Sequence, residues 1–432
     1  MAPLIRHIRS LASRFARVDL VKVFSITSLS TLVRMCTGLI SVKVVAAIIG
    51  PAGVAMLGQF GNFVSIILSI ASGGINWGIT KYVSEYRHDR DTVAAYISTA
   101  LRITMICTLL SAIIMIVLHR RLAALVMLSA DYGYVFLIFG FTLLLYSVNN
   151  LLLSIINGYK EFRKFVAVNI ANSIVGLLFT VLLVFTWQLR GALIATVTYQ
   201  SVVLFVTVGM LRKTPWFRPG MFSQRLSRAI ASKYFRYTLM TATTALTLPV
   251  TQMLLRGYVI AEISPVEAGW WEGMTRISSM YLLVITSSLG VYFLPRLSEI
   301  HDRLELRAEL IRAYKIILPV LLVGCVAIYL LRHVVIWLLF TDAFAPMQGL
   351  FGWQLAGDFF KISSWILAYQ MIAKAMTRTF IITEIASSAS FLVLGYLFVR
   401  LDGITGLCQA YLINYIIYTV TMLVIFRKTL RR

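Results

Sequence analysis

The chain has 432 residues, of which 59% are hydrophobic, and its formal net charge at pH 7 is +23. In a soluble protein that charge would suggest nucleic acid as a partner. Here a mean hydropathy of +0.85 and repeated apolar runs indicate a polytopic membrane protein whose basic loops hold its cytoplasmic ends in place, so no nucleic acid is expected. The four cysteines, Cys36, Cys107, Cys325 and Cys408, lie far apart in apolar segments, which predicts packing residues and neither disulfides nor metal ligands.

Apolar runs of membrane-spanning length predict an all-α integral membrane protein with about twelve transmembrane helices. We expect the spans at about 20–48, 54–78, 95–118, 132–157, 165–187, 191–212, 234–260, 266–294, 310–331, 346–372, 379–399 and 403–426. Residues 1–19 alternate arginines with apolar side chains, which predicts a basic cytoplasmic interfacial segment. Lys and Arg gather in alternate loops and at both ends, so both termini are predicted to be cytoplasmic. The basic residues expected in outer loops are Arg120, Arg121, Arg190, Arg256, Arg332 and Arg400.

The second half of the chain repeats the first at a shift of about 214 residues. Ser84-Glu85 and His88-Asp89-Arg90 recur as Ser298-Glu299 and His301-Asp302-Arg303. Because each half has an even number of spans, both halves enter the membrane in the same direction and are related by a pseudo-twofold axis along the membrane normal. We therefore expect two six-helix lobes, at 20–213 and 234–432, joined by a cytoplasmic linker at 214–233.

Polar residues in the first span share one helical face. Thr27, Ser30, Arg34, Thr37 and Ser41 follow one another at spacings of 3 and 4. Arg34 lies 14 residues after the expected start of the span, or roughly 21 Å, which places it near the bilayer centre. A charge at that depth costs several kcal/mol and is tolerated where it faces protein or water. The sequence therefore predicts a cationic cavity around Arg34.

Further polar stripes predict a wet cleft between bundles. The residues expected to line it and to bind sugar hydroxyls are Asn62, Ser69, Asn76, Asn150, Asn157, Asn172 and Gln354. Any single stripe is explained equally well by helix packing, since small and amide side chains also join helices in membranes.

Charged pairs within spans of the second half allow two interpretations. Glu272 with Arg276, and Asp358 with Lys361, have opposite charges at pairing distance on one helix, so each pair could simply neutralise itself. Alternatively, Arg276 and Lys361 join Arg34 as a pyrophosphate receptor, leaving Asp358 or Glu272 to exchange H⁺ or Na⁺. Lys43 belongs to this receptor if its helix bends at Gly38; otherwise it snorkels to the interface from the opposite face.

Several segments carry a resemblance that covers nearly the whole chain. They are Gly50-Pro51-Ala52-Gly53, Thr80-Lys81-Tyr82-Val83, Leu248-Pro249-Val250, YFLPRL at 292–297 and FGWQLAGDFFK at 351–361. With two six-span halves and a basic cleft, the sequence resembles the polysaccharide flippases of the multidrug/oligosaccharidyl-lipid/polysaccharide exporter superfamily, and most of all the enterobacterial common antigen lipid III and O-antigen flippases. Arg34, Lys43, Asp358 and Lys361 fall in segments that align with charged positions of that family, whereas Arg102 and Arg276 match no family pattern.

The resemblance implies a flippase of cell-surface polysaccharide biosynthesis in the bacterial inner membrane. Its substrate would be an undecaprenyl-pyrophosphate-linked oligosaccharide, moved from the cytoplasmic to the periplasmic leaflet by alternating access. The cycle is expected to use an ion gradient, H⁺ or Na⁺, and no other cofactor. Expected partners are anionic lipids of the inner membrane, a glycan polymerase and a chain-length regulator. Trp270, Trp271 and Trp365 are available to stack on sugar rings, although an interfacial aromatic belt explains them as well.

Three alternatives stay open at this point. The first is a multidrug or organic-cation antiporter of the same superfamily, which would require an acidic cavity. The second is a membrane enzyme acting on the same lipid. Asp89-Arg90-Asp91 has the two-carboxylate spacing of some sugar-nucleotide transferases but falls in a short charged loop, and no loop is long enough for a catalytic domain, so we expect no enzyme. The third is a non-transporting partner in glycan assembly.

Overall fold

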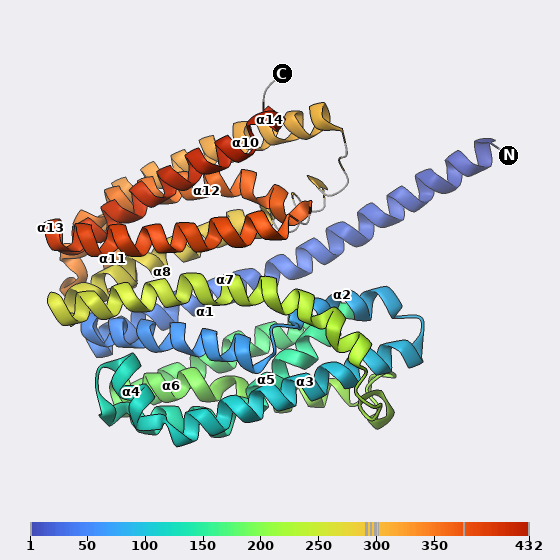
Figure 1. Ribbon diagram of the computed structural model, residues 1–432, viewed down its shortest axis with the longest axis horizontal. Coiled ribbons are helices and arrows are strands. Elements are labelled where there is room, and N and C mark those ends of the chain that lie inside the picture. Colours follow the sequence, from blue (N-terminus) through green and yellow to red (C-terminus); the bar gives the residue numbers. More distant parts are fainter. Residues whose placement is uncertain are drawn as a thin grey trace.

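The computed structural model describes residues 2–289, 302–374 and 376–430, together with Phe293, Arg296, Leu297 and Ile300. Side chains are described from residue 29 on, apart from helical positions 236, 237, 240, 287, 288, 428 and 430. Half of the YFLPRL segment, and Ser298, Glu299 and His301 of the predicted repeat, lie outside the described residues. Within the described ranges every regular element is helical (Figure 1).

Each half of the chain forms its own series of helices. The first half contains α1 (Ala2–Ala71), α2 (Asn76–Tyr86), α3 (Arg90–Val117), α4 (His119–Met127), η1 (Ala130–Tyr132), α5 (Gly133–Gly158) and α6 (Phe162–Leu211). The second contains η2 (Pro219–Phe222), α7 (Arg228–Glu262), α8 (Pro265–Ser288), α10 (Arg303–Leu330), α11 (Arg332–Leu339), η4 (Asp342–Leu350), α12 (Phe351–Ala373), α13 (Thr377–Ile425) and α14 (Arg427–Leu430). Helices pair their backbone groups internally, as a lipid environment requires.

Breaks inside three long helices give the predicted number of spans. Six helices are long and apolar enough to cross a membrane, and three of them, α1, α6 and α13, turn back at an internal break. Gly50 has a positive φ of 65°, which glycine adopts easily, and Pro51 then starts the next helix, where its missing N–H is not needed. Counting these three twice and adding α7, α8 and α12 gives twelve spans within the described chain. The all-α membrane fold is confirmed.

The element order confirms the internal repeat. α3 begins at Arg90 with Asp89 as its N-cap, and α10 begins at Arg303 with Asp302 as its N-cap. Each of these helices is followed by a short one, α4 or α11. We call the end of the molecule where α1 begins the near end, and the end where α1 breaks at Gly50 the far end; they lie to the right and left in Figure 1.

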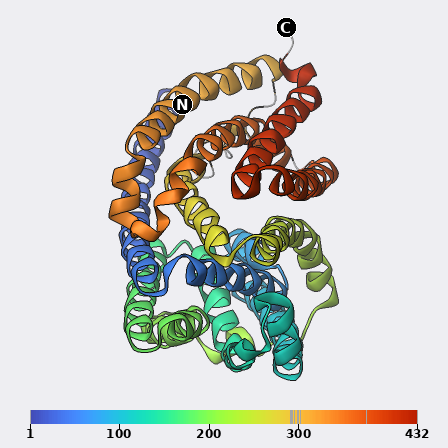
Figure 2. The same cartoon turned by 90° about the vertical axis from the view of Figure 1, so that its left-hand side faces the viewer.

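The two halves form two lobes that meet along α1, α7 and α8. Viewed from the far end, the first half lies below and the second half above (Figure 2). α1 packs against α7 and α8, and α7 also packs against α2 and α3 of the first half and α13 of the second. At the far end the backbones approach closely: a Cβ on Gly269 of α8 would lie 2.0 Å from the Pro51 carbonyl oxygen.

Two predicted boundaries differ from the structure. α1 runs without a break from Ala2 to Gly50, so residues 1–19 do not form an element separate from the first span within the described range. α7 begins at Arg228, and 228–233 are therefore its first turns and not part of the linker. Tyr234 of α7 donates a hydrogen bond to the Tyr96 carbonyl of α3 (3.3 Å), so the near end of α7 is fixed to the first lobe.

Candidate functional site

A cavity of about 550 Å³ lies between the lobes, and we call it the inter-lobe cavity. α1, α7 and α8 supply its walls. Its polar lining residues are Arg34, Ser41, Asn62, Gln252, Glu272, Thr275, Arg276 and Ser279, and its apolar ones are Met35, Gly38, Val42, Met280 and Leu283. The predicted cationic cavity around Arg34 therefore has a counterpart in the structure, and both lobes contribute to it.

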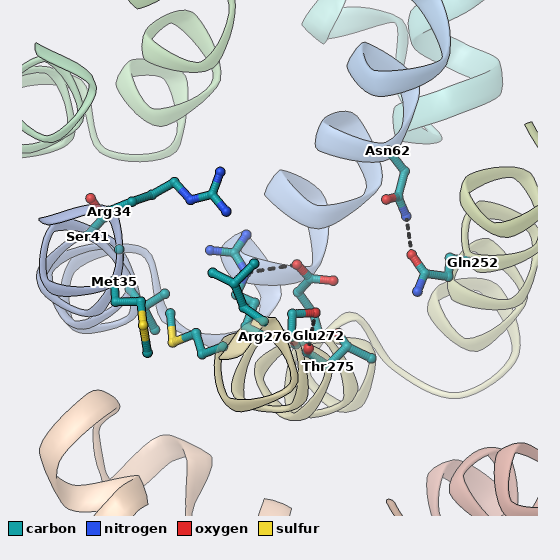
Figure 3. Close-up of a pocket in the computed structure, with 13 residues that line it drawn as sticks. Arg34, Met35, Ser41, Asn62, Gln252, Glu272, Thr275 and Arg276 are labelled. Atoms are coloured by element: carbon teal, nitrogen blue, oxygen red, sulfur yellow. Dashed lines mark hydrogen bonds and ion pairs between the residues drawn. The ribbon is translucent and has the colours of Figure 1, made fainter. Parts of the chain in front are cut away.

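Arg34 of α1 and Arg276 of α8 reach the same space from two neighbouring helices. Figure 3 shows their guanidinium groups pointing into the inter-lobe cavity. The side chain of Arg34 is exposed, and among the described residues its guanidinium has no hydrogen-bond or ion-pair partner. Thr37, on the predicted stripe, uses its hydroxyl within the helix by donating to the Val33 carbonyl oxygen (2.9 Å). Arg34 is thus a cation with its donors available to a ligand.

Glu272 binds two arginines, one of which sequence reasoning missed. Arg276 Nε donates to Glu272 Oε1 (2.8 Å), which confirms the predicted pair, and Arg256 donates to Glu272 Oε2 (2.5 Å). The assignment of Arg256 to an outer loop was wrong: it lies within α7, is 1% exposed and stacks over the Trp271 ring at 5.3 Å. The sequence did contain a sign of this position, because Arg256 follows the polar residue Gln252 by four positions and so lies on the same helix face. We call Arg256, Glu272 and Arg276 the Arg-Glu-Arg cluster.

The charges of the inter-lobe cavity do not cancel. Glu272 neutralises one of its two arginines, so the Arg-Glu-Arg cluster keeps one net positive charge. Arg34 of α1 adds a second positive charge. The charged lining residues Arg34, Arg276 and Glu272 sum to one positive charge, and the buried Arg256 behind them raises the total to about two, close to what is needed to replace the water around a group with two negative charges.

Amide side chains join the lobes beside this cavity. Asn62 of α1 donates to Gln252 Oε1 of α7 at 3.2 Å, and Gln59 donates to the Met253 carbonyl oxygen at 3.1 Å. Asn62 is thus a lining residue as predicted, although its amide is partly used in holding α1 against α7.

A second cavity, of about 230 Å³, lies within the second lobe, and we call it the C-lobe cavity. It shares Gln252, Thr275, Ser279 and Leu283 with the inter-lobe cavity, so the two adjoin. The predicted residues Gln354 and Lys361 line it, together with Trp271, Trp365, Phe391, Tyr411 and Tyr415. Lys361 therefore does not share a cavity with Arg34 but lies in the next compartment.

Asp358 is held by hydroxyl groups and not by Lys361. Ser278 donates to Oδ2 at 2.7 Å, Tyr411 donates to Oδ1 at 2.8 Å, and Tyr281 also donates to Oδ2. The predicted Asp358–Lys361 ion pair does not form among the described residues, because neighbouring helices supply these donors to the buried carboxylate. Since a hydroxyl donates or accepts, the same groups can satisfy either protonation state of Asp358.

Lys43 lies outside both cavities. Its ammonium donates to the carbonyl oxygens of Trp337 (2.7 Å) and Phe340 (2.5 Å), at the C-terminal end of α11. A cation is stabilised there by the unpaired carbonyls of the helix end. Lys43 is nine residues from Arg34, so the two side chains point to opposite faces of α1. Lys43 therefore joins α1 to the second lobe at the far end and does not belong to the predicted pyrophosphate receptor around Arg34.

The predicted sugar-binding stripe is not assembled. Asn76 is separated from Asn62 by a turn at Gly73 and Gly74, both with φ of 65°, and begins α2. The predicted residues that line neither the inter-lobe nor the C-lobe cavity are Ser69, Asn76, Asn150, Asn157 and Asn172. Helical spacing predicted a common face, but the helix ends at Ala71.

The twelve-span fold with two repeated lobes and a charged cavity between them defines a multi-pass membrane transporter. A solved structure described as the inward-facing conformation of a multidrug resistance MATE family transporter of the MOP superfamily has the same fold, with a TM-score of 0.79, 14% identity, and coverage of 93% of this chain and 98% of that one.

The chain belongs to the family described as Polysaccharide biosynthesis protein, whose model matches residues 20–301. It is also 29% identical over 405 residues to the Lipid III flippases of Escherichia coli (strain K12) and Shigella flexneri, which covers 93% of this chain and 96% of each relative. The resemblance to the polysaccharide flippases of this superfamily is confirmed.

Proposed function

We propose that this protein is a flippase that moves an undecaprenyl-pyrophosphate-linked oligosaccharide from the cytoplasmic to the periplasmic leaflet of a bacterial inner membrane. The similarity to Lipid III flippases supports the class of substrate. The observation that carries the proposal is the inter-lobe cavity, where the free guanidinium of Arg34 faces Arg276 across the two lobes.

The chemistry of a pyrophosphate suits this cavity. Its two or so negative charges match the two net positive charges of Arg34 and the Arg-Glu-Arg cluster, and a guanidinium offers a planar fork to phosphate oxygens. Ser41 adds a hydroxyl donor for the sugar beside it, while the Thr275 and Ser279 hydroxyls, which donate to the carbonyls of Glu272 and Thr275, add acceptors. The polyprenyl tail stays in lipid, so only the polar head must enter.

Contacts between the lobes suggest which end is closed. Gly269 lies against the Pro51 backbone at the far end, and Lys43 binds the carbonyls of α11 there. With both termini and the basic loops in the cytoplasm, the far end is periplasmic and this state faces the cytoplasm. Loading from the inner leaflet, separation at the far end and release outside would make one alternating-access cycle.

The coupling ion, H⁺ or Na⁺, would act at Asp358. Glu272 is fully engaged by two arginines, whereas Asp358 has only hydroxyl partners. We expect no resident metal or organic cofactor. Asp358→Asn, which keeps the shape, is expected to abolish any gradient dependence of flipping while leaving downhill flipping in liposomes; a variant with an undiminished response to the gradient would exclude Asp358.

The same proposal places the protein in enterobacterial common antigen or O-antigen biosynthesis, as a transporter and not an enzyme. Its expected partners are anionic inner-membrane lipids along the basic loops, a glycan polymerase and a chain-length regulator. An organic-cation antiporter of the same superfamily is disfavoured by the net positive charge of the inter-lobe cavity, which would repel a cationic drug.

The test is flipping by purified protein in liposomes. The substrate is a short-chain prenyl-pyrophosphate oligosaccharide, followed by its access to an external glycan-modifying enzyme, with and without a pH or sodium gradient. Arg34→Ala is expected to lower the rate to that of protein-free liposomes, and Arg34→Lys to retain part of it. Arg121→Ala, an exposed arginine on α4, is the matched control.

Two results would contradict the proposal. Full flipping by Arg34→Ala would remove Arg34 from the anion site. Absence of flipping by well-folded wild type would favour the non-transporting partner in glycan assembly, and extrusion of organic cations in the same liposomes would favour the antiporter.

A further inference from the structure

The second lobe holds another carboxyl group besides Asp358 within its spans, that of Glu384. Glu384 is seven residues after α13 begins at Thr377, or about 10 Å along the helix. Its side chain is half-buried, and its Oε1 accepts a hydrogen bond from the Tyr418 hydroxyl (3.2 Å). Ionisable side chains are costly inside a membrane and commonly mark ion or proton pathways. Glu384 is therefore a candidate for such a pathway.

The two carboxyl groups lie at different depths. α12 runs from the far end to the near end, and Asp358 is seven residues after it begins at Phe351. α13 starts back from the near end, so Glu384 is close to that end. In the proposed orientation Asp358 is nearer the periplasm and Glu384 nearer the cytoplasm. A route between them would carry charge across part of the membrane.

Three tyrosines on α13, which we call the tyrosine row, connect the two carboxyl groups. Tyr411, Tyr415 and Tyr418 follow one another at spacings of four and three, which places them on one helix face. Tyr411 donates to Asp358 Oδ1 (2.8 Å), and Tyr418 donates to Glu384. Successive ring centroids are 4.8 and 6.4 Å apart. Tyr411 and Tyr415 also line the C-lobe cavity, whose volume of about 230 Å³ can hold water beside their hydroxyls.

The internal repeat shows that packing does not require these polar groups. When Gly191 is aligned with Gly403, the first lobe has Tyr199, Val203 and Val206 at the positions of the tyrosine row and Asn172 at the position of Glu384. The first lobe therefore builds the same helices without the second and third hydroxyls and without the carboxyl group. Their presence in the second lobe indicates a function other than packing.

Lys361 decides how many protons the two carboxyl groups hold. Its ammonium interacts electrostatically with both Asp358 and Glu384, although no ion pair within 4.0 Å forms among the described residues. The other titratable side chains that interact with the two carboxyl groups are Tyr281, Cys325, Cys408 and Tyr411 around Asp358, and Tyr415 and Tyr418 around Glu384. Thiols and phenols are neutral at neutral pH, so the balance of charge depends on the lysine and the two carboxyl groups.

This balance favours one bound proton. With Lys361 charged, the three groups have no net charge when one carboxyl group is protonated, and a net negative charge when neither is. An uncompensated charge is costly in a buried, low-dielectric site. Asp358 and Glu384 together should therefore hold one proton.

We infer that Asp358 and Glu384 share one proton, and that the tyrosine row passes it from Asp358 to Glu384 as the lipid moves outward. This inference rests on the proposed flippase function and selects H⁺ as the coupling ion. Asp358 gives its proton to the Tyr411 oxygen while the proton of that hydroxyl moves on along the row. One O–H bond breaks at Asp358, one forms at Glu384, and each tyrosine keeps one proton.

Infrared spectroscopy of the purified full-length protein tests the shared proton without transport. The signal is the C=O stretch of protonated carboxyl groups at neutral pH, where Glu272 and Glu309, which are paired with arginines, are ionised. Wild type is expected to show one buried protonated group. Asp358→Asn and Glu384→Gln are each expected to remove its signal, because the remaining carboxylate then balances Lys361.

Two further variants make this result specific. Lys361→Met is expected to double the infrared signal, since both carboxyl groups must then be protonated to avoid a net charge. Glu262→Gln, the same change at an exposed glutamate of α7, is the control and is expected to leave the signal unchanged. Absence of the signal in wild type, or its persistence in folded Asp358→Asn or Glu384→Gln, would overturn the shared proton.

Proton entry into liposomes tests the tyrosine row. A pH-sensitive dye inside the liposomes follows the protons that enter when a pH gradient and a lipid-linked glycan are supplied. Tyr415→Phe and Tyr418→Phe remove one hydroxyl each and are expected to slow this entry about 100-fold, the contribution of a positioned proton-transfer group. Tyr199→Phe removes a hydroxyl from the first lobe and is the control. Proton entry at the wild-type rate in both row variants would overturn the row.

Flipping by Glu384→Gln separates this inference from the proposed function. A response to the pH gradient in wild type that is lost in Glu384→Gln, with the rate in the absence of a gradient unchanged, supports both. An equal response in the two proteins, or a response to sodium alone, overturns the proton path while the flippase stands. An infrared signal removed by either carboxyl substitution, without flipping by wild type, supports the shared proton and overturns the flippase.

Discussion

The two lobes share a skeleton and differ in where they keep charge. α3 and α10 are each capped by an aspartate and each followed by a short helix. Among the described residues, the buried charged side chains are Arg256, Glu272, Glu309 and Asp358, all in the second half. The first lobe instead buries neutral polar groups, such as the Asn149–Thr207 hydrogen bond of 2.7 Å.

Equivalent positions of the two lobes show how this difference arises. Lys43 and Arg256 are equivalent, because Lys43 lies as far before the break at Gly50 as Arg256 lies before Ile263, the C-cap of α7. Gln59 and Glu272 are equivalent in the same way, since they follow Gly50 and Ile263 by the same number of residues. In the second lobe the pair is an ion pair (2.5 Å); in the first, Lys43 instead binds α11. The repeat thus supplies a frame, while single substitutions decide which lobe binds anions.

The largest expected effect comes from making the second lobe like the first. Glu272→Gln introduces the residue found at the equivalent Gln59 and leaves Arg256 buried without a counter-charge. We expect the free energy of unfolding to fall by about 3–5 kcal/mol. Thermal unfolding in detergent measures it. The double variant Arg256→Met with Glu272→Gln removes the unpaired charge and should recover most of the loss; a stable single variant would contradict the assignment.

The contact between the lobes at the far end gives the next effect. Gly269→Ala places a Cβ against the Pro51 carbonyl, which must move, and we expect a loss of about 1–3 kcal/mol. The far end should also open, so a cysteine introduced at Ser264 in a background lacking the native cysteines should react faster with an impermeant thiol reagent. Gly61→Ala, with no atom within 4 Å, is the control. Unchanged stability and labelling would mean that this contact does not hold the far end closed.

The smallest expected effect comes from the two equivalent N-caps, Asp89 in the first lobe and Asp302 in the second, which should contribute equally to stability. Asp302 accepts a hydrogen bond from the Glu305 N–H at 2.9 Å, and Asp302→Ala is expected to cost about 1 kcal/mol, measured by thermal unfolding. Asp89→Ala should lower the unfolding temperature to a similar extent. Hydrogen bonds from Thr92 lower the pKa of the Asp89 carboxyl, so its contribution is full above the ordinary Asp pKa and is lost as pH falls below it. A much larger effect in one lobe would contradict their equivalence.

The fold was predictable because it depends on local patterns. Apolar run lengths gave the spans, and the glycine and proline at Gly50-Pro51 marked a reversal that the structure contains. The repeat placed Asp89 and Asp302 at equivalent positions, and the structure shows that both are helix N-caps. Boundaries failed where a polar segment continued a helix, as at residues 228–233.

The site was predictable only where partners share a helix. Glu272 and Arg276 are four residues apart, and their pairing followed from spacing. The second partner of Glu272, Arg256, comes from α7, and the donors to Asp358 come from α8 and α13. Spacing within one helix does not identify such neighbours, and for that reason it could not decide between the two interpretations of Asp358 and Lys361, of which the self-neutralising pair does not form among the described residues.

The net charge of the inter-lobe cavity has an electrical consequence. Empty, the cavity carries about two positive charges from Arg34 and the Arg-Glu-Arg cluster; occupied by a pyrophosphate, it is nearly neutral. Moving one elementary charge through 100 mV corresponds to about 2.3 kcal/mol. An interior-negative membrane voltage would then act little on the loaded carrier and would pull the empty one back towards the cytoplasm, so the voltage itself would favour net outward movement of the lipid.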